Sequence, residues 1–165
     1  MQYLKLLFIG FLFINCANKA PELEKLEKPE EPKLIYTYEI SRELQPYVFE
    51  YMNTLEEFGI EFKKQSFIVV FDADIMGSNL LGQAKGMFND NLIYVKVNPK
   101  LWNQLTVKQR RHVIFHELSH DIFNIEHTEK IKLMNDSMPS PQDSFAMNIQ
   151  QEIINLMMYI RNEQS

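Results

Sequence analysis

Apolar residues recur at helical spacing in three stretches of the chain. Over residues 41–58 they return every three or four positions, while Glu and Asn side chains fall on the opposite side of the helix. This pattern predicts a helix that ends before Gly59. A second helix is expected to begin after Thr106, which forms a capping box with Gln109, and to continue to about Phe123.

A last helix is predicted near the C-terminus. Ser140 as N-cap, Pro141 at the first helical position and Asp143 at the third are typical of a helix start. The apolar stripe of this helix comprises Phe145, Ile149, Ile153, Leu156, Met157 and Ile160.

Strands are predicted on both sides of the first helix. Residues 34–40 alternate well enough for a short strand, and the apolar run Ser66–Phe71 is typical of a central strand covered on both faces. Residues 80–88 and 92–97 flank a turn-prone Asn-Asp-Asn triplet and predict a hairpin, with the first arm at the sheet edge. The element order is strand, helix, strands, hairpin, helix, loop, helix, without internal repeats.

Length and composition suit one globular domain. The chain has 165 residues, of which 45% are hydrophobic, enough for a sizeable core with little left for a second domain. Its formal net charge is −5, from 17 basic and 22 acidic residues, and no basic stripe with interleaved aromatics is visible. Nucleic acid is therefore not expected as a partner. The single cysteine excludes an internal disulfide framework and a cysteine-rich zinc site.

Residues 1–15 have the pattern of a secretory signal peptide. Lys5 precedes the apolar run of residues 6–14, and polar sequence follows at once. A helix that crosses a bilayer needs about 20 apolar residues, so an uncleaved anchor is the less favoured alternative.

Cys16 lies directly after the apolar run, where bacterial lipoproteins carry the cysteine that is lipidated. The residues before it resemble a relaxed lipobox of the kind found in spirochaetes and some Bacteroidetes, with Phe13 in place of Leu and Asn15 in place of Gly or Ala. This resemblance implies an exported lipoprotein held to a membrane by its N-terminal lipid. Such a protein would face the periplasm or lie at the outer membrane or cell surface.

Residues 17–33 contain three prolines among Glu and Lys residues and no aromatics. Such a segment cannot bury enough apolar surface to fold, so we expect an extended tether between Cys16 and a folded domain over residues 34–165. An inhibitory pro-segment is the alternative, but its glutamates are better explained as solvated than as metal ligands.

His116-Glu117-Leu118-Ser119-His120 has the H-E-x-x-H form of a zinc-hydrolase helix. Residues four apart lie nearly above one another on a helix, so His116 and His120 can hold one ion from one face. Glu117 is about 100° further round, close enough to act on a water bound to that ion. All four histidines of the chain fall in this region, which makes an accidental motif on a surface helix the weaker interpretation.

His112 lies one turn before His116, next to the face that carries the motif. A lone histidine is usually a packing or surface residue, and that interpretation is preferred here over a contact with the site. The opposite face of the helix is expected to enter the core through Ile114, Phe115, Leu118 and Ile122.

From the hairpin to the last helix, the chain resembles the metzincin-type zinc metallopeptidases, especially their compact bacterial lipoprotein versions. His116 and His120 match the first two metal ligands of that family, and Glu117 matches its general base. The segment around Met134 resembles the methionine turn that supports the metal without binding it. The resemblance implies an α+β fold with a mixed twisted sheet, an antiparallel edge strand, an active-site helix and a C-terminal helix.

The third ligand departs from the spacing of that family. The family places it ten residues after the first histidine, which is Glu126 here, and has a turn glycine where Phe123 stands. If Asn124 takes the left-handed conformation that ends a helix, His127 reaches the position of the third ligand. Imidazole is preferred to carboxylate in this arrangement, so His127 is favoured and Glu126 remains the alternative.

The resemblance implies peptide hydrolysis by a zinc-activated water, with Glu117 taking the water proton and passing it to the leaving amine. The edge strand around Gln83, Ala84 and Lys85 would align an extended peptide or protein substrate through main-chain hydrogen bonds. The protein is expected to be a monomer.

Two other functions fit the same sequence. A surface lipoprotein that binds zinc or a host ligand without catalysis would keep the site, although it would not need Glu117 for metal binding. A purely structural lipoprotein would bind no stoichiometric metal. The peptidase is preferred because the complete motif, including Glu117, is present.

Overall fold

The computed structural model describes residues 37–62, 66–89, 91–136 and 147–164, which belong to one unit spanning Leu34–Ser165. The predicted signal peptide (1–15), Cys16 and the predicted tether (17–33) lie outside the described residues. So do the predicted start of the last helix at Ser140 and the first residue of its stripe, Phe145. No helix among the described residues is long and apolar enough to cross a membrane.

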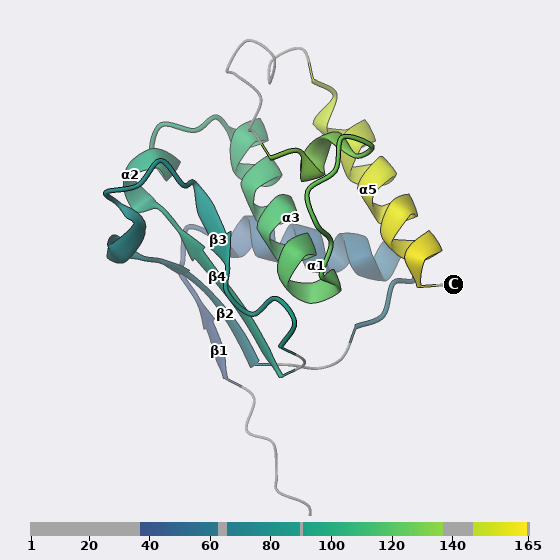
Figure 1. Cartoon of the computed structure of the whole chain (residues 1–165), viewed down its shortest axis with the longest axis horizontal. Helices are drawn as coiled ribbons and strands as arrows, with labels where there is room; N and C mark the ends of the chain where they lie inside the picture. Colours follow the sequence, from purple (N-terminus) through teal and green to yellow (C-terminus); the bar gives the residue numbers. More distant parts are fainter. Residues whose placement is uncertain (1–36, 63–65, 90, 137–146, 165) are drawn as a thin grey trace, which may run out of the picture. The chain divides into compact units, whose positions relative to one another are not determined.

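Four strands form one mixed sheet in the described chain (Figure 1). They are β1 (Tyr38–Ile40), β2 (Ser66–Phe71), β3 (Gly82–Ala84) and β4 (Leu92–Val97), in the spatial order β1-β2-β4-β3. The pairs β1–β2 and β2–β4 are parallel, while β3 runs antiparallel to β4 at the edge. The predicted α+β class, mixed sheet and antiparallel edge strand are therefore confirmed.

Strand β2 is central, as predicted, but it is not covered equally on both faces. Phe67 and Val69 are fully buried, whereas Ile68 and Val70 on the opposite face are only partly buried. The described helices α1 and α3 lie on one side of the sheet, so alternate side chains of β2 enter the core (Figure 1). The continuous apolar run predicted two covered faces because it does not show which side the helices take.

The first arm of the predicted hairpin is shorter than residues 80–88. Only Gly82–Ala84 pairs as a strand with β4, although the Lys85 N–H still donates to the Tyr94 carbonyl over 2.7 Å. The Gly86 N–H then turns away from the ladder and donates to the Asp121 carboxylate of the following long helix. A side chain distant in sequence thus ends the strand.

The described helices are α1 (Gln45–Glu57), α2 (Pro99–Trp102), α3 (Val107–Phe123) and α5 (Ile149–Glu163), with short 3-10 turns η1 (Ala73–Ile75) and η2 (Lys132–Met134). Helix α3 has the predicted bounds and capping box. Helix α1 begins later than residue 41, because Pro46 stands in its first turn, where proline is tolerated. Helix α5 begins after Asn148, whose side chain accepts from the Gln151 N–H.

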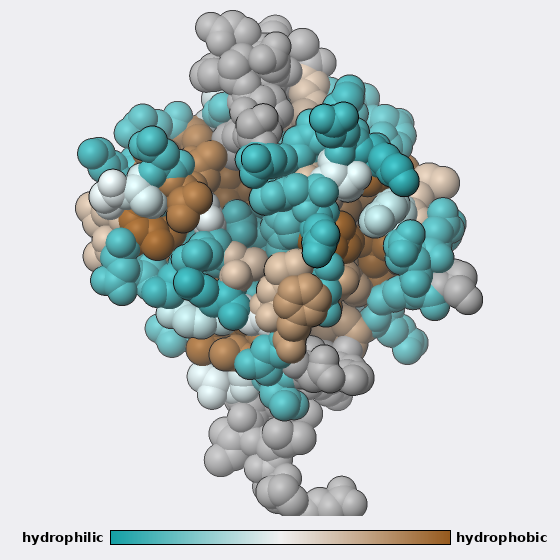
Figure 2. Space-filling view, viewed as in Figure 1, coloured by the Kyte–Doolittle hydropathy of each residue, from teal (hydrophilic) through white to brown (hydrophobic). Residues whose placement is uncertain are grey.

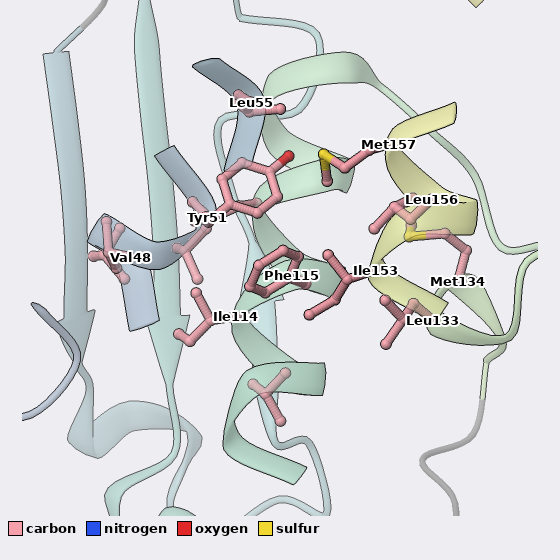
Figure 3. Close-up of a cluster of buried hydrophobic side chains, with 14 of the residues drawn as sticks. Val48, Tyr51, Leu55, Ile114, Phe115, Leu133, Met134, Ile153, Leu156 and Met157 are labelled. Atoms are coloured by element: carbon pink, nitrogen blue, oxygen red, sulfur yellow. The ribbon is translucent and has the colours of Figure 1, made fainter. Parts of the chain in front are cut away.

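Helix α3 lies between the sheet and α5 (Figure 1). It contacts α1, β3, β4, η2 and α5. The Tyr51 and Phe115 rings pack edge to face with centroids 5.0 Å apart, and the Tyr51 and Ser119 hydroxyls are hydrogen-bonded over 3.1 Å. Figure 3 shows side chains from the helices and η2 in one buried cluster that includes Val48, Tyr51, Leu55, Ile114, Phe115, Leu133, Met134, Ile153, Leu156 and Met157.

Met157→Ala is expected to lower the free energy of unfolding by about 2–5 kcal/mol, because it leaves a cavity in this cluster. Met157 is fully buried, whereas the neighbouring Met158 is 46% exposed. Met158→Ala removes the same atoms from the surface and should change stability by less than about 0.5 kcal/mol. Equal losses for the two variants in urea unfolding would contradict the packing of α5 against the core.

Candidate metal centre and cleft

The face of α3 opposite the core forms the floor of a cleft of about 760 Å³. His112, His116, Glu117 and His120 line it from the helix, and β3 with the preceding residues lines one wall. The other wall comes from the segment after α3, including Glu126, His127, Asn135 and Asp136. Figure 2 shows hydrophilic residues across the middle of this face of the molecule, with apolar residues on both sides.

Three imidazoles meet in this cleft. The Nε2 atom of His116 lies 3.0 Å from Nε2 of His120 and 3.2 Å from Nε2 of His127. In the described part of the chain, these residues form the only group of three or more His, Cys, Asp or Glu residues with ligand atoms close enough for one metal ion. The structure therefore brings together the two motif histidines and the favoured third one.

The outer nitrogen of each imidazole has its own partner. His116 Nδ1 donates to the Leu133 carbonyl over 2.6 Å, and His120 Nδ1 donates to the Ile125 carbonyl. The third imidazole, His127, has Nδ1 3.3 Å from an Asp136 carboxylate oxygen. A carbonyl can only accept, so the protons of His116 and His120 lie on Nδ1 and their Nε2 atoms carry lone pairs.

The two motif histidines are held in the neutral form. Burial is the main cause that lowers the pKa of His116 to about 3, and burial also lowers the pKa of His120. Two Nε2 lone pairs therefore face each other over 3.0 Å without a proton between them. A cation satisfies both: four-coordinate zinc with Zn–N bonds of 2.0–2.1 Å places its ligand nitrogens about 3.3 Å apart. The donor set fits a metal ion.

His127 reaches the cluster because the chain turns at Asn124. Asn124 has the left-handed conformation, with φ 54° and ψ 32°, and it follows the last residue of α3 as predicted. Glu126 borders the cleft but is not part of the three-residue cluster. The predicted turn is confirmed, and it brings the imidazole rather than the carboxylate toward the other two ligand atoms.

Asn124 also ties the end of α3 to the hairpin. Its side-chain oxygen accepts from the Phe88 N–H over 2.6 Å. Phe88 has φ 63° and is 73% exposed. Asn124 and Phe88 are the only non-glycine residues with positive φ in the described chain, so one hydrogen bond joins two strained backbone positions.

Glu117 is buried against the edge strand. A Cβ atom on Gly82 would lie 2.6 Å from Glu117 Cγ, so only glycine permits this approach. Burial is the main cause that raises the pKa of Glu117 to about 8, and the Asp121 charge raises it further, while a hydrogen bond from the Ala84 N–H lowers it. The carboxyl borders the same cleft as the three imidazoles.

Asp121 was not singled out from the sequence, yet it holds the hairpin to α3. Its carboxylate accepts from the N–H groups of Gly86 over 2.7 Å and of Tyr94 over 3.3 Å, and also from that of Lys85. Burial raises its pKa to about 6 despite these bonds. The sequence signal for this role was a carboxylate directly after His120 on the predicted helix, together with a preceding hairpin that contains glycine.

The remaining predicted site residues fall in different places. Gln83 and Ala84 belong to β3 and line the cleft, whereas Lys85 follows the strand and is not among the lining residues. Met134 is fully buried in η2, next to Leu133, whose carbonyl anchors His116. Its carbonyl accepts from the Thr128 N–H, which helps to close the loop that carries His127.

His112 is a buried packing residue, as preferred from the sequence, but it also borders the cleft, which that prediction did not expect. It is 3% exposed, and its ring stacks on that of His116 with centroids 5.9 Å apart. Burial lowers its pKa to about 4, so the imidazole is neutral. The prediction missed this contact because the cleft extends one helical turn beyond the motif, which the sequence does not show.

No known protein family, no characterised protein and no solved structure matches this chain. The chemistry of the cleft is therefore argued from its own residues and distances.

His127→Ala is expected to lower zinc affinity by more than about 100-fold, since even outer partners of metal ligands are worth 10–100-fold. Glu126→Ala changes the adjacent residue in the same cleft wall and should leave affinity within a few-fold of the unchanged chain. Competition with a chromophoric chelator measures both. The reverse order of losses would make Glu126 the third ligand.

Proposed function

We propose that this protein is a zinc-dependent peptidase of the metzincin-like kind. The observation that carries the proposal is the convergence of three imidazole Nε2 atoms beside a buried glutamate and a sheet edge. An imidazole set of this kind suits zinc and leaves a fourth position open to the cleft. His116, His120 and His127 are the residues that would hold the ion.

Bound zinc supplies a Lewis acid that brings the pKa of a water molecule to about 7 and polarises a carbonyl group. His116 and His120 contribute neutral imidazole donors, which the Leu133 and Ile125 carbonyls orient. An ion held by the histidines would supply the positive charge in a cleft whose lining residues include no lysine or arginine.

Glu117 is assigned the general base. Its carboxyl accepts the water proton and then returns it to the leaving amine, which is the role that the second residue of the motif supports. Burial raises the pKa of Glu117, and a divalent cation on the neighbouring imidazoles would lower it again. The carboxyl could then both take up and release a proton near neutral pH.

Strand β3 is assigned the substrate contact. It pairs with β4 on one side only, and its residues Gln83 and Ala84 border the cleft. An extended peptide can add to such an edge by main-chain hydrogen bonds, which would carry its backbone past Glu117. A peptide or protein substrate would then lie in the cleft without a requirement for a particular side chain at the edge.

The proposal includes export and lipid anchoring at Cys16, on the N-terminal sequence alone. A tether over residues 17–33 would then let a monomeric domain act near a membrane, facing the periplasm or at the cell surface.

A zinc-binding lipoprotein without catalysis is the rival. It keeps the three histidines and predicts zinc binding without cleavage that depends on Glu117. The close fit of Glu117 against Gly82 favours the peptidase, because a metal-binding role alone does not require that contact.

Glu117→Gln is expected to keep zinc stoichiometry and to lower cleavage of an unstructured protein such as casein by about 10²–10⁴-fold, the range of general-base catalysis. Glu129→Gln, an exposed residue outside the cleft, is the matched control and should cleave at the unchanged rate. The peptidase would be refuted if Glu117→Gln bound zinc and cleaved as fast as the unchanged protein, or if no form of the protein cleaved casein. The binding function would then remain.

Gly82→Ala is expected to reduce kcat, because the added methyl group displaces the Glu117 side chain from its place against β3. The loss should be at least about tenfold, since 1 Å misplacements of reacting groups cost up to about 100-fold. Gly77→Ala adds the same methyl group where no atom lies within 4 Å and should be silent. Parallel zinc titrations check that the histidine cluster is intact in both variants.

A further inference from the structure

The third histidine of the cluster is held less firmly by its own segment than the other two. His116 and His120 lie on α3, and the Leu133 and Ile125 carbonyls accept from their outer nitrogens. His127 lies beyond the end of α3, outside any helix or strand, and its side chain is 47% exposed. Ordering an exposed side chain costs conformational entropy, so a further contact is needed to keep its Nε2 directed at the cluster.

The segment after η2 brings such a contact. An Asp136 carboxylate oxygen lies 3.3 Å from His127 Nδ1, the ring nitrogen that is not directed at His116. Asp136 and His127 both border the cleft. The Asp136 side chain is 89% exposed, so packing in the core does not explain why its carboxylate lies beside the ring.

A closed loop keeps the two residues near each other. The Thr128 N–H donates to the Met134 carbonyl over 2.9 Å, which joins the residue after His127 to the residue two before Asp136. Within this loop, Met134 is fully buried and Ile131 is 8% exposed. The loop is therefore anchored in the core, and mainly the side-chain torsions of His127 and Asp136 remain to be fixed.

A carboxylate at this place selects the tautomer that a metal ligand requires. An ionised carboxylate only accepts, so a hydrogen bond to Asp136 needs the proton of His127 on Nδ1. The lone pair of the neutral ring then lies on Nε2, which is 3.2 Å from Nε2 of His116. Without such a partner both tautomers are open to a neutral imidazole, and one of them has a proton where a metal would bind.

The same segment already orients another histidine. The Leu133 carbonyl, three residues before Asp136, accepts from His116 Nδ1. A carboxylate acts more strongly than a carbonyl, because hydrogen bonds to ionised groups are about twice as strong and raise the basicity of the ligand. His127 is the most exposed of the three histidines, and it has the partner that can support it best.

We propose that Asp136 is a positioning residue of the metal centre, which accepts from His127 Nδ1 and keeps Nε2 unprotonated and directed at His116 and His120. In this role it touches neither the ion nor the substrate. The proposal rests on the proposed function for the identity of the ion, whereas the contact itself lies within the chain and can be tested without metal.

The first test follows the tautomer of His127 in the metal-free protein. The full chain, labelled with ¹⁵N-histidine, is studied by NMR at about pH 8, where an ordinary histidine is neutral. His127→Gln identifies the His127 signals. We expect the Nδ1–H tautomer at His127 and a mixture of tautomers after Asp136→Ala, while His116 and His120 keep theirs. An unchanged His127 tautomer in Asp136→Ala overturns the proposal.

The second test measures zinc affinity by competition with a chromophoric chelator. Asp136→Ala should weaken binding by about tenfold, the lower end of the 10–100-fold range for outer partners of metal ligands, because water screens an exposed carboxylate. Asp136→Asn keeps an acceptor oxygen and should recover part of this loss. Unchanged zinc affinity in Asp136→Ala would contradict the positioning role.

Glu126→Gln is the matched control for charge. Glu126 borders the same cleft and is adjacent to His127 in sequence, so this variant removes one negative charge near the ion and leaves the Nδ1 contact in place. Its zinc affinity should stay within a few-fold of that of the unchanged protein. Equal losses in Glu126→Gln and Asp136→Ala would mean that only the charge of the cleft matters, which overturns the proposal.

The two proposals fail in different ways. If the unchanged protein binds no zinc, the proposed function is wrong, and the tautomer of His127 still decides whether Asp136 holds the ring. If Glu117-dependent cleavage is found but Asp136→Ala binds zinc as tightly as the unchanged protein, the peptidase stands and the positioning role is overturned.

Discussion

The hydrogen bonds on the outer nitrogens of the histidines are the interactions on which the cleft depends. The Leu133 and Ile125 carbonyls fix the protons of His116 and His120 on Nδ1, so the two Nε2 lone pairs must face inward. Both carbonyls come from the segment that follows α3. The helix therefore supplies the imidazoles, but their tautomers are set only after the chain has turned back over it.

That turn has a modest energetic cost, which is largely offset locally. A left-handed non-glycine residue costs about 1–2 kcal/mol, and Asn124 is the type that tolerates it best after glycine. The hydrogen bond from the Phe88 N–H to the Asn124 side chain contributes about 0.5–1.5 kcal/mol in return. Glycine would give the same backbone conformation without this bond, so asparagine serves both the turn and the hairpin.

The parts of the fold that follow local rules were predictable from the sequence. The capping box at Thr106 and the left-handed turn at Asn124 give the bounds of α3, and the spacing of the motif gives its polar face. The short β3 was not predictable, because Asp121 ends it from 35 residues away. The place of His112 at the cleft was equally hidden, since it depends on how far the cleft extends along α3. Local pattern fixes which side chains α3 offers, while distant contacts decide what surrounds them.

The end of α3 links the metal ligands to the sheet edge. His120 is followed at once by Asp121, which accepts hydrogen bonds from the hairpin, and soon after by Asn124, which accepts one more from it. Gly82 lies in direct contact with Glu117 at the other end of β3, so the strand has little freedom to slide. The spacing between the sheet edge and the histidine cluster is therefore fixed by side chains of α3 at both ends. A paired strand of only three residues is sufficient for this reason: side chains of α3 add to the ladder with β4 in holding the edge in place.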